Sequence, residues 1–127
     1  MNNSEKGSPS DDFIYSLLEH YQHGRLSDAE KLALEITRDF PKHQFAWKVL
    51  GVIFEATGRK SEALNANKTA VKLSPQDAEA HNNLGNTLKE LGRLDEAEAS
   101  YNQALVLKPD QLRPTATWAS YFITLGN

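Results

Sequence analysis

Glycine recurs along this chain at a fixed step of 34 residues. The four positions are Gly24, Gly58, Gly92 and Gly126. Four more columns keep the same step, and they hold Arg25, Arg59 and Arg93; Ser27, Ser61 and Asp95; Ala29, Ala63 and Ala97; and Pro41, Pro75 and Pro109. Several independent columns in register are hard to obtain by chance. A fixed period of this length is typical of chains built from stacked structural repeats.

The residue types in these columns predict a pair of helices in each unit. Glycine ends the first helix because it adopts the left-handed backbone conformation at little cost. Ser27 and Asp95 are expected to cap second helices, each with a glutamate three residues later that completes a capping box. Alanine is expected where the two helices approach closely, and proline in the first turn of the next helix. Apolar residues between these marks recur at steps of three and four, which is the helical period.

The third unit resembles the tetratricopeptide repeat. Its text, AEAHNNLGNTLKELGRLDEAEASYNQALVLKPD, carries residues typical of that family at the family's spacing, namely Leu84, Gly85, Leu88, Ala97, Tyr101, Ala104 and Pro109. The second unit carries Trp47, Leu50, Gly51, Phe54, Ala63, Ala70 and Pro75. Asn67 stands there in place of the usual aromatic residue, so packing around it is expected to be weaker. In the first unit Leu17 replaces the small residue and His20 the large one, as expected of a divergent end repeat.

The resemblance implies an all-α fold, a right-handed superhelical solenoid of about seven helices. The repeats are expected at residues 10–43, 44–77 and 78–111, with a half repeat at 112–127. These units make up one domain, residues 10–127. Residues 1–9 are expected to be a disordered N-terminal lead-in, because they are polar and precede the first unit.

The last eleven residues, TWASYFITLGN, carry no charge and several aromatic side chains. They align with the first helix of a fourth unit and stop at its turn. A repeat buries its apolar face against its neighbours, so this helix would expose an apolar surface unless something covers it. The chain could be part of a longer protein, a second copy could cover the helix, or the helix could turn inward as its own cap. For self-association, as a homodimer, the candidate residues are Trp118, Tyr121, Phe122 and Leu125.

Composition excludes several classes of partner. The net charge of −3 gives no basic excess with which to bind nucleic acid or an anionic membrane. No apolar run approaches the roughly 20 residues that span a bilayer, and the polar N-terminus has no secretory signal. The absence of cysteine removes disulfides, thiolate metal sites and cysteine nucleophiles. It is compatible with the reducing cytoplasm, where we expect the protein to act.

The sequence shows little sign of catalysis. His20 and His23 lie three residues apart on a predicted helix, a spacing that two metal ligands can share. No H-E-x-x-H pattern accompanies them, and we interpret them as surface histidines. No serine lies in a G-x-S-x-G turn, and the widely spaced glycines do not form a phosphate-binding loop. We therefore expect no enzyme, no metal and no cofactor.

The resemblance places a binding groove on the concave face, which the first helices of successive units line. The candidate groove residues are Lys48, Val52, Glu55, Glu79, Asn82, Asn83, Asn86, Lys89 and Arg113. Three asparagines within five residues favour a role in binding, because an amide can both donate to and accept from an extended peptide backbone. The alternative is that these asparagines are merely solvated polar positions.

Two precedents within the family can be compared residue by residue. Chaperone-binding members hold a terminal carboxylate with Lys, Asn, Asn, Lys and Arg, and here only Lys48, Asn83 and Arg113 match in kind. The repeats of O-linked N-acetylglucosamine transferases carry an asparagine ladder, of which only Asn83 is present. We therefore predict a protein–protein interaction scaffold that binds a peptide or a partner helix in its groove. The alternatives are docking through the last helix and a regulatory segment of a larger glycosyltransferase or sulfotransferase.

Overall fold

The computed structural model describes residues 9–108, and every regular element in that range is a helix. The helices are α2 (Asp11–Gln22), α3 (Leu26–Asp39), α4 (Gln44–Ala56), α5 (Lys60–Leu73), α6 (Ala78–Glu90) and α7 (Leu94–Leu107). This confirms the predicted all-α class. The further helix predicted within 112–127, with the self-association residues it carries, lies outside the described residues. None of the helices in the described range is both long and apolar enough to cross a membrane.

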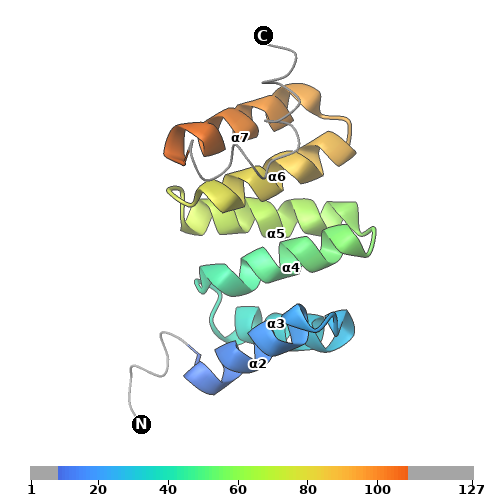
Figure 1. The fold of residues 1–127 in the computed structure, drawn as a ribbon, viewed down its shortest axis with the longest axis vertical. Coiled ribbons are helices and arrows are strands. Elements are labelled where there is room, and N and C mark those ends of the chain that lie inside the picture. Colours follow the sequence, from blue (N-terminus) through green and yellow to red (C-terminus); the bar gives the residue numbers. More distant parts are fainter. Residues whose placement is uncertain (1–8, 109–127) are drawn as a thin grey trace.

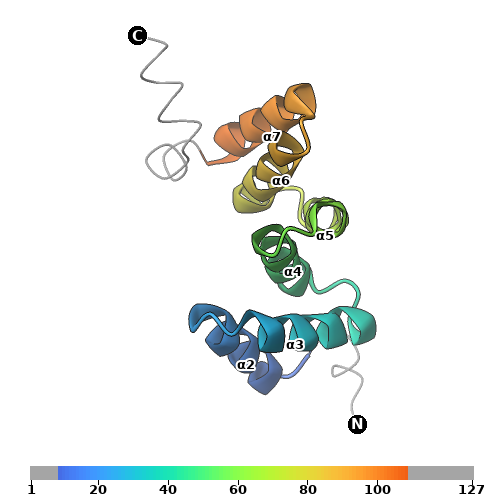
Figure 2. The ribbon, with the colours of Figure 1, turned by 90° about the vertical axis from the view of Figure 1, so that its right-hand side faces the viewer.

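The helices form antiparallel pairs that stack along the long axis of the molecule (Figure 1). The pairs are α2 with α3, α4 with α5, and α6 with α7, and they fall within the three predicted units. The second helix of each pair packs on the first helix of the next pair, and α4 also touches α6. Viewed from the side, the pairs follow one another as successive layers (Figure 2). The fold is therefore the predicted helical solenoid.

Glycine makes the turn inside each pair, as predicted. Gly24, Gly58 and Gly92 have φ angles of 73°, 80° and 80°. A Cβ atom built on any of them would meet nothing within 4 Å. Space is therefore no constraint at these positions, and the left-handed backbone conformation alone accounts for the glycine column.

The predicted caps of the second helices are wrong. Helices α3 and α7 begin one residue before Ser27 and Asp95, and the residues that precede them make no side-chain cap. Both side chains therefore stand inside the first turn, where Asp95 still favours the positive end of the helix dipole. The predicted place of proline is also wrong. Pro41 and Pro75 lie in the loops between pairs, ahead of the helix caps His43 and Asp77.

Glu30, which was expected in a capping box, instead joins the first pair to the second. Its two carboxylate oxygens accept hydrogen bonds from the Arg59 guanidinium at 2.8 Å and 2.5 Å. The hydrogen bond from Arg59 lowers the pKa of Glu30, and the charge of Arg59 adds to this against the opposing effect of burial. The same guanidinium lies 4.8 Å from the centre of the Phe54 ring. Arg59 therefore fixes the stacking of α3 on the α4–α5 pair.

In the second and third pairs, residues sixteen positions apart in sequence make a close contact between the two helices, and no two pairs carry the same combination at these positions. In the third pair Tyr101 packs on Gly85, and in the second pair Asn67 packs on Gly51. The first pair has Leu17 and Ala33 at these positions, and both are fully buried in one cluster. Leu17 stands where the other two pairs have glycine, and the other residue of its pair is the small Ala33. The combined volume of the two side chains therefore stays roughly constant.

Candidate functional site

A pocket of about 230 Å³ opens between α4, α5 and α6. We call it the amide pocket, because three asparagines contribute to its wall. Its lining residues are Gly51, Val52, Glu55, Ala56, Asn67, Asn83, Asn86 and Thr87. Val52, Glu55, Asn83 and Asn86 are among the predicted groove residues. The structure thus brings four of them together around one hollow.

Asn67, one of the lining residues of the amide pocket, is shorter than the residue at the same position in the next pair. There, the ring of Tyr101 covers Gly85, and its hydroxyl donates to Asn86 Oδ1 at 2.6 Å. Burial, followed by the charges of Glu90 and Glu55, raises the pKa of Tyr101, so the hydroxyl remains a donor at neutral pH. Asn67 covers its own glycine but reaches no further along α4. A tyrosine at this position would extend further from α5 than Asn67 does.

A buried polar chain forms the floor of the amide pocket. Thr87, which is 0% exposed, donates to Glu55 Oε1 at 2.9 Å and accepts from Asn67 Nδ2, also at 2.9 Å. The chain links one residue from each of three helices, so it fixes their relative positions. Asn67 is 2% exposed, and its Oδ1 atom has no hydrogen-bond partner among the described residues. A buried acceptor of this kind is costly unless something donates to it.

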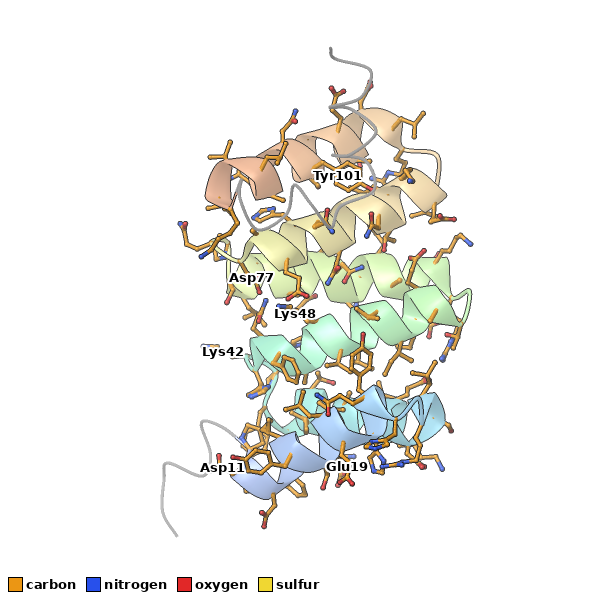
Figure 3. The ribbon with its side chains drawn as sticks, in the orientation of Figure 1. Asp11, Glu19, Lys42, Lys48, Asp77 and Tyr101 are labelled. Atoms are coloured by element: carbon orange, nitrogen blue, oxygen red, sulfur yellow. The ribbon has the colours of Figure 1, made fainter. Side chains whose placement is uncertain are left out.

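Lys48 and Glu79, two further predicted groove residues, form an ion pair where α6 begins. Lys48 Nζ lies 2.7 Å from Glu79 Oε1 and 2.9 Å from Asp77 Oδ2. Asp77 caps α6 by accepting from two backbone N–H groups, and Figure 3 shows its side chain close to Lys48 of α4. The Lys48 side chain is only 16% exposed. It therefore ties α4 to α6 and is not available as a free cation for a ligand.

The same contacts set the ionisation of this group of residues. Burial alone would raise the pKa of Asp77, but the hydrogen bonds from Lys48 and Gln44 and the charge of Lys48 outweigh it, so the pKa is lowered. Burial would likewise lower the pKa of Lys48, and the hydrogen bonds with Glu79 and Asp77 raise it instead. Both groups are charged at neutral pH.

We expect Lys48→Met to reduce the free energy of unfolding by about 2 kcal/mol near neutral pH, because it leaves the half-buried carboxylate of Asp77 without its cationic partner. A carboxyl whose pKa is lowered on folding stabilises the fold above its unfolded pKa, near 3.8 for Asp77, and loses that effect as pH falls through the folded pKa. The deficit of the variant should therefore shrink below about pH 4.

Urea unfolding from about pH 7 down to about pH 3 measures this deficit. Lys89→Met is the matched control, because Lys89 is exposed on α6, and its cost should be small at every pH. A deficit of Lys48→Met that stays constant over the range would contradict the assignment to Asp77.

The remaining predicted groove residues lie apart from the amide pocket. Asn82 is half-buried on α6, and Lys89 lines a different hollow, between α6 and α7. Arg113 lies outside the described residues. The chaperone-type clamp therefore has Lys48 in an ion pair and Asn83 at the pocket, and its other matching position is not described.

Sequence reasoning missed Asn67 and Thr87 as site residues. The signal for Asn67 was present, since it breaks the column that holds Tyr101 one unit later. By itself, this break predicts weaker packing rather than an opening. Thr87 gave no signal, because a threonine inside a helix is unremarkable until its burial among three helices is known.

The two histidines considered as metal ligands have other contacts. His20 Nδ1 accepts from Arg25 Nε at 3.0 Å, and His23 Nδ1 lies 2.9 Å from the carbonyl oxygen of Glu19. Across residues 9–108 no group of three or more His, Cys, Asp or Glu side chains is placed to hold a metal ion.

Two known repeat families match stretches of this chain. The pattern described as "Tetratricopeptide repeat" matches residues 78–111, and the one described as "TPR repeat" matches residues 51–92. The chain contains tetratricopeptide repeats, over residues 51–111. The matched ranges include the turn glycines at 58 and 92 and all the residues that line the amide pocket.

Three similar proteins extend the comparison. The peroxisomal targeting signal receptor of Kluyveromyces lactis is 31% identical over 77 residues, which is 61% of this tetratricopeptide repeat chain and 14% of the receptor. A mutant O-GlcNAc transferase of Thermobaculum terrenum superposes with a TM-score of 0.73 at 28% identity, over 80% of this chain and 20% of that one. The type III secretion translocator chaperone SycD of Yersinia enterocolitica superposes with a TM-score of 0.78 at 18% identity, over 91% of this chain and 89% of that one. At 18% identity, the likeness to SycD shows the fold alone.

Proposed function

We propose that this chain is a protein-interaction scaffold that holds an extended segment of a partner protein across α4 and α6, over the amide pocket. The observation that carries the proposal is the convergence of Val52, Glu55, Asn83 and Asn86 on one hollow. Their helices belong to successive units, so a bound segment would lie across the repeats. We expect the protein to do this in the cytoplasm and without a catalytic step of its own.

The chemistry of this surface suits an extended backbone. The side-chain amides of Asn83 and Asn86 offer both donors and acceptors, which complement the N–H and C=O groups of a peptide. Val52 and Ala56 add an apolar wall for a side chain. Ligand sites commonly combine apolar walls with a few convergent polar groups.

The names of two similar proteins support a polypeptide as the partner. One is a receptor for a targeting signal, and the other is a chaperone of a secretion translocator. Because this chain spans a small part of the receptor, and because its likeness to SycD concerns the fold, we carry over only the class of partner.

We expect Asn83→Ala to weaken binding of a partner segment about 5–10-fold, the effect of losing one or two hydrogen bonds. Asn102→Ala is the matched control. It makes the same change in helix propensity at an exposed position of α7, away from the amide pocket. Segments for the test come from a displayed library of random peptides selected on the wild-type protein, and calorimetric titration measures their affinities. Equal losses for both variants, or failure to select any segment, would rule out the proposed face.

A second candidate function is that of a repeat segment of a larger glycosyltransferase. The likeness to the O-GlcNAc transferase at 28% identity favours it, and this chain covers only 20% of that enzyme. In that case the face of α4 and α6 would hold a protein substrate of the downstream enzyme. Self-association through Trp118, Tyr121, Phe122 and Leu125 stays a prediction, which light scattering behind a sizing column would test.

A further inference from the structure

We propose that the amide pocket receives a basic side chain, arginine or lysine, of the bound segment. This inference rests on the proposed function and adds the chemistry of the residue that anchors the segment. It follows from three properties of the pocket, which are its acceptors with unused capacity, its negative charge and its apolar wall.

Several acceptors of the amide pocket have unused capacity. Asn67 Oδ1 is buried without a partner among the described residues. One oxygen of Glu55 accepts from Thr87, and a carboxylate has further lone pairs to offer. Asn86 Oδ1 accepts from Tyr101 and has a second lone pair. A ligand group rich in donors and free of acceptors fits this set, and guanidinium and ammonium groups have that character.

The charge of the amide pocket favours a cation over a neutral donor. Glu55 is the charged residue among those that line it, and no lysine or arginine of the described chain contributes to its wall. The two cations that join successive units are already paired, Lys48 with Asp77 and Glu79, and Arg59 with Glu30. A neutral amide could donate to Asn86 Oδ1 but would leave the charge of Glu55 uncompensated, and an acidic side chain would be repelled.

The shape of the amide pocket suits a long side chain with a polar end. Gly51, Val52 and Ala56 supply apolar surface on α4, against which the methylene groups of arginine or lysine can pack. The next pair carries a tyrosine at the position of Asn67, and a guanidinium resembles the ring of that tyrosine in being flat.

Two matched peptides test the charge requirement. The first is a blocked pentapeptide with arginine between pairs of alanines, and the second has citrulline, which is equal in size but uncharged, in place of arginine. Both are titrated into ¹⁵N-labelled protein, and the side-chain amide signals of Asn67, Asn83 and Asn86 report binding. We expect the arginine peptide to shift these signals with a dissociation constant about tenfold lower than that of the citrulline peptide, the effect of charge-assisted hydrogen bonds.

Two variants test the assignment to this pocket. Asn67→Tyr should close the amide pocket, as Tyr101 closes the third pair, and weaken arginine-peptide binding at least about tenfold. Glu55→Gln keeps an acceptor for Thr87 but removes the charge, and it should abolish the preference for arginine over citrulline. Far-ultraviolet circular dichroism checks that both variants fold. If Asn67→Tyr does not fold, Glu55→Gln still tests the assignment.

The outcomes separate this inference from the proposed function. Equal binding of the two peptides, no binding of the arginine peptide, or unchanged binding by both folded variants would overturn the basic-residue pocket. If library segments still bind in an Asn83-dependent way, the proposed function stands and this inference alone falls. If no segment binds at all, both fall.

Discussion

Replacing Gly85 by leucine is expected to reduce the free energy of unfolding by about 2–3 kcal/mol, the usual cost of overpacking a filled core. A Cβ atom at this position would lie 2.6 Å from Cε1 of Tyr101, well inside van der Waals contact. The ring cannot simply swing away, because its hydroxyl is held by Asn86. Leucine has a better helix propensity than glycine, by somewhat less than 1 kcal/mol, so the measured cost already includes that gain.

The clash should be relieved by shortening the opposite residue. Tyr101→Ala alone is expected to cost about 3–5 kcal/mol, because it leaves a cavity. The double variant reproduces the leucine–alanine combination that Leu17 and Ala33 form, fully buried, in the first pair. Its cost should therefore be lower than the sum of the two single costs by about 2 kcal/mol.

Urea unfolding followed by circular dichroism at 222 nm measures all four members of this cycle. The wild type and the two single variants supply the reference for the coupling. Costs that add without any coupling would show that these two positions do not share one volume. The exchange of large and small residues between pairs would then have another cause.

Leu50→Ala is expected to have the second large effect, a loss of about 3 kcal/mol. Leu50 is 1% exposed and belongs to the cluster that joins the first and second pairs. Since each pair is stabilised by its neighbours, a cavity here weakens two units at once. Val106→Ala, at a position that is 75% exposed, is the control and should change the stability by no more than about 0.5 kcal/mol.

The midpoint and slope of urea unfolding report this second prediction. A smaller slope in the Leu50 variant would mean that the first pair unfolds separately from the others. Similar costs for Leu50→Ala and Val106→Ala would contradict the assignment of Leu50 to the shared core.

The pairing of helices could be predicted because its causes are local. A turn at Gly24, Gly58 or Gly92 needs a positive φ angle, and that need is met by one residue whatever its neighbours are. The helical period of apolar residues is likewise a property of short stretches of chain. A step of 34 residues repeats these local causes, so the order of helices and the stacking of pairs followed from it.

The partners of charged residues could not be predicted in the same way. Glu30 looked like part of a capping box, but the helix began earlier and the carboxylate reached Arg59, 29 residues away in sequence. Lys48 looked like a groove cation, but the start of α6 places two carboxylates beside it. Such contacts depend on the offset between successive pairs, which the packing of whole helices decides.

The sequence by itself therefore determined the repeat and the turns. It also showed that Asn67 departs from the tyrosine at the same place in the next unit. Only the tertiary structure decided what the departure does, because the neighbouring side chains could have closed over the shorter residue. The polar chain through Thr87 instead holds α4, α5 and α6 in place, so the volume stays open as the amide pocket.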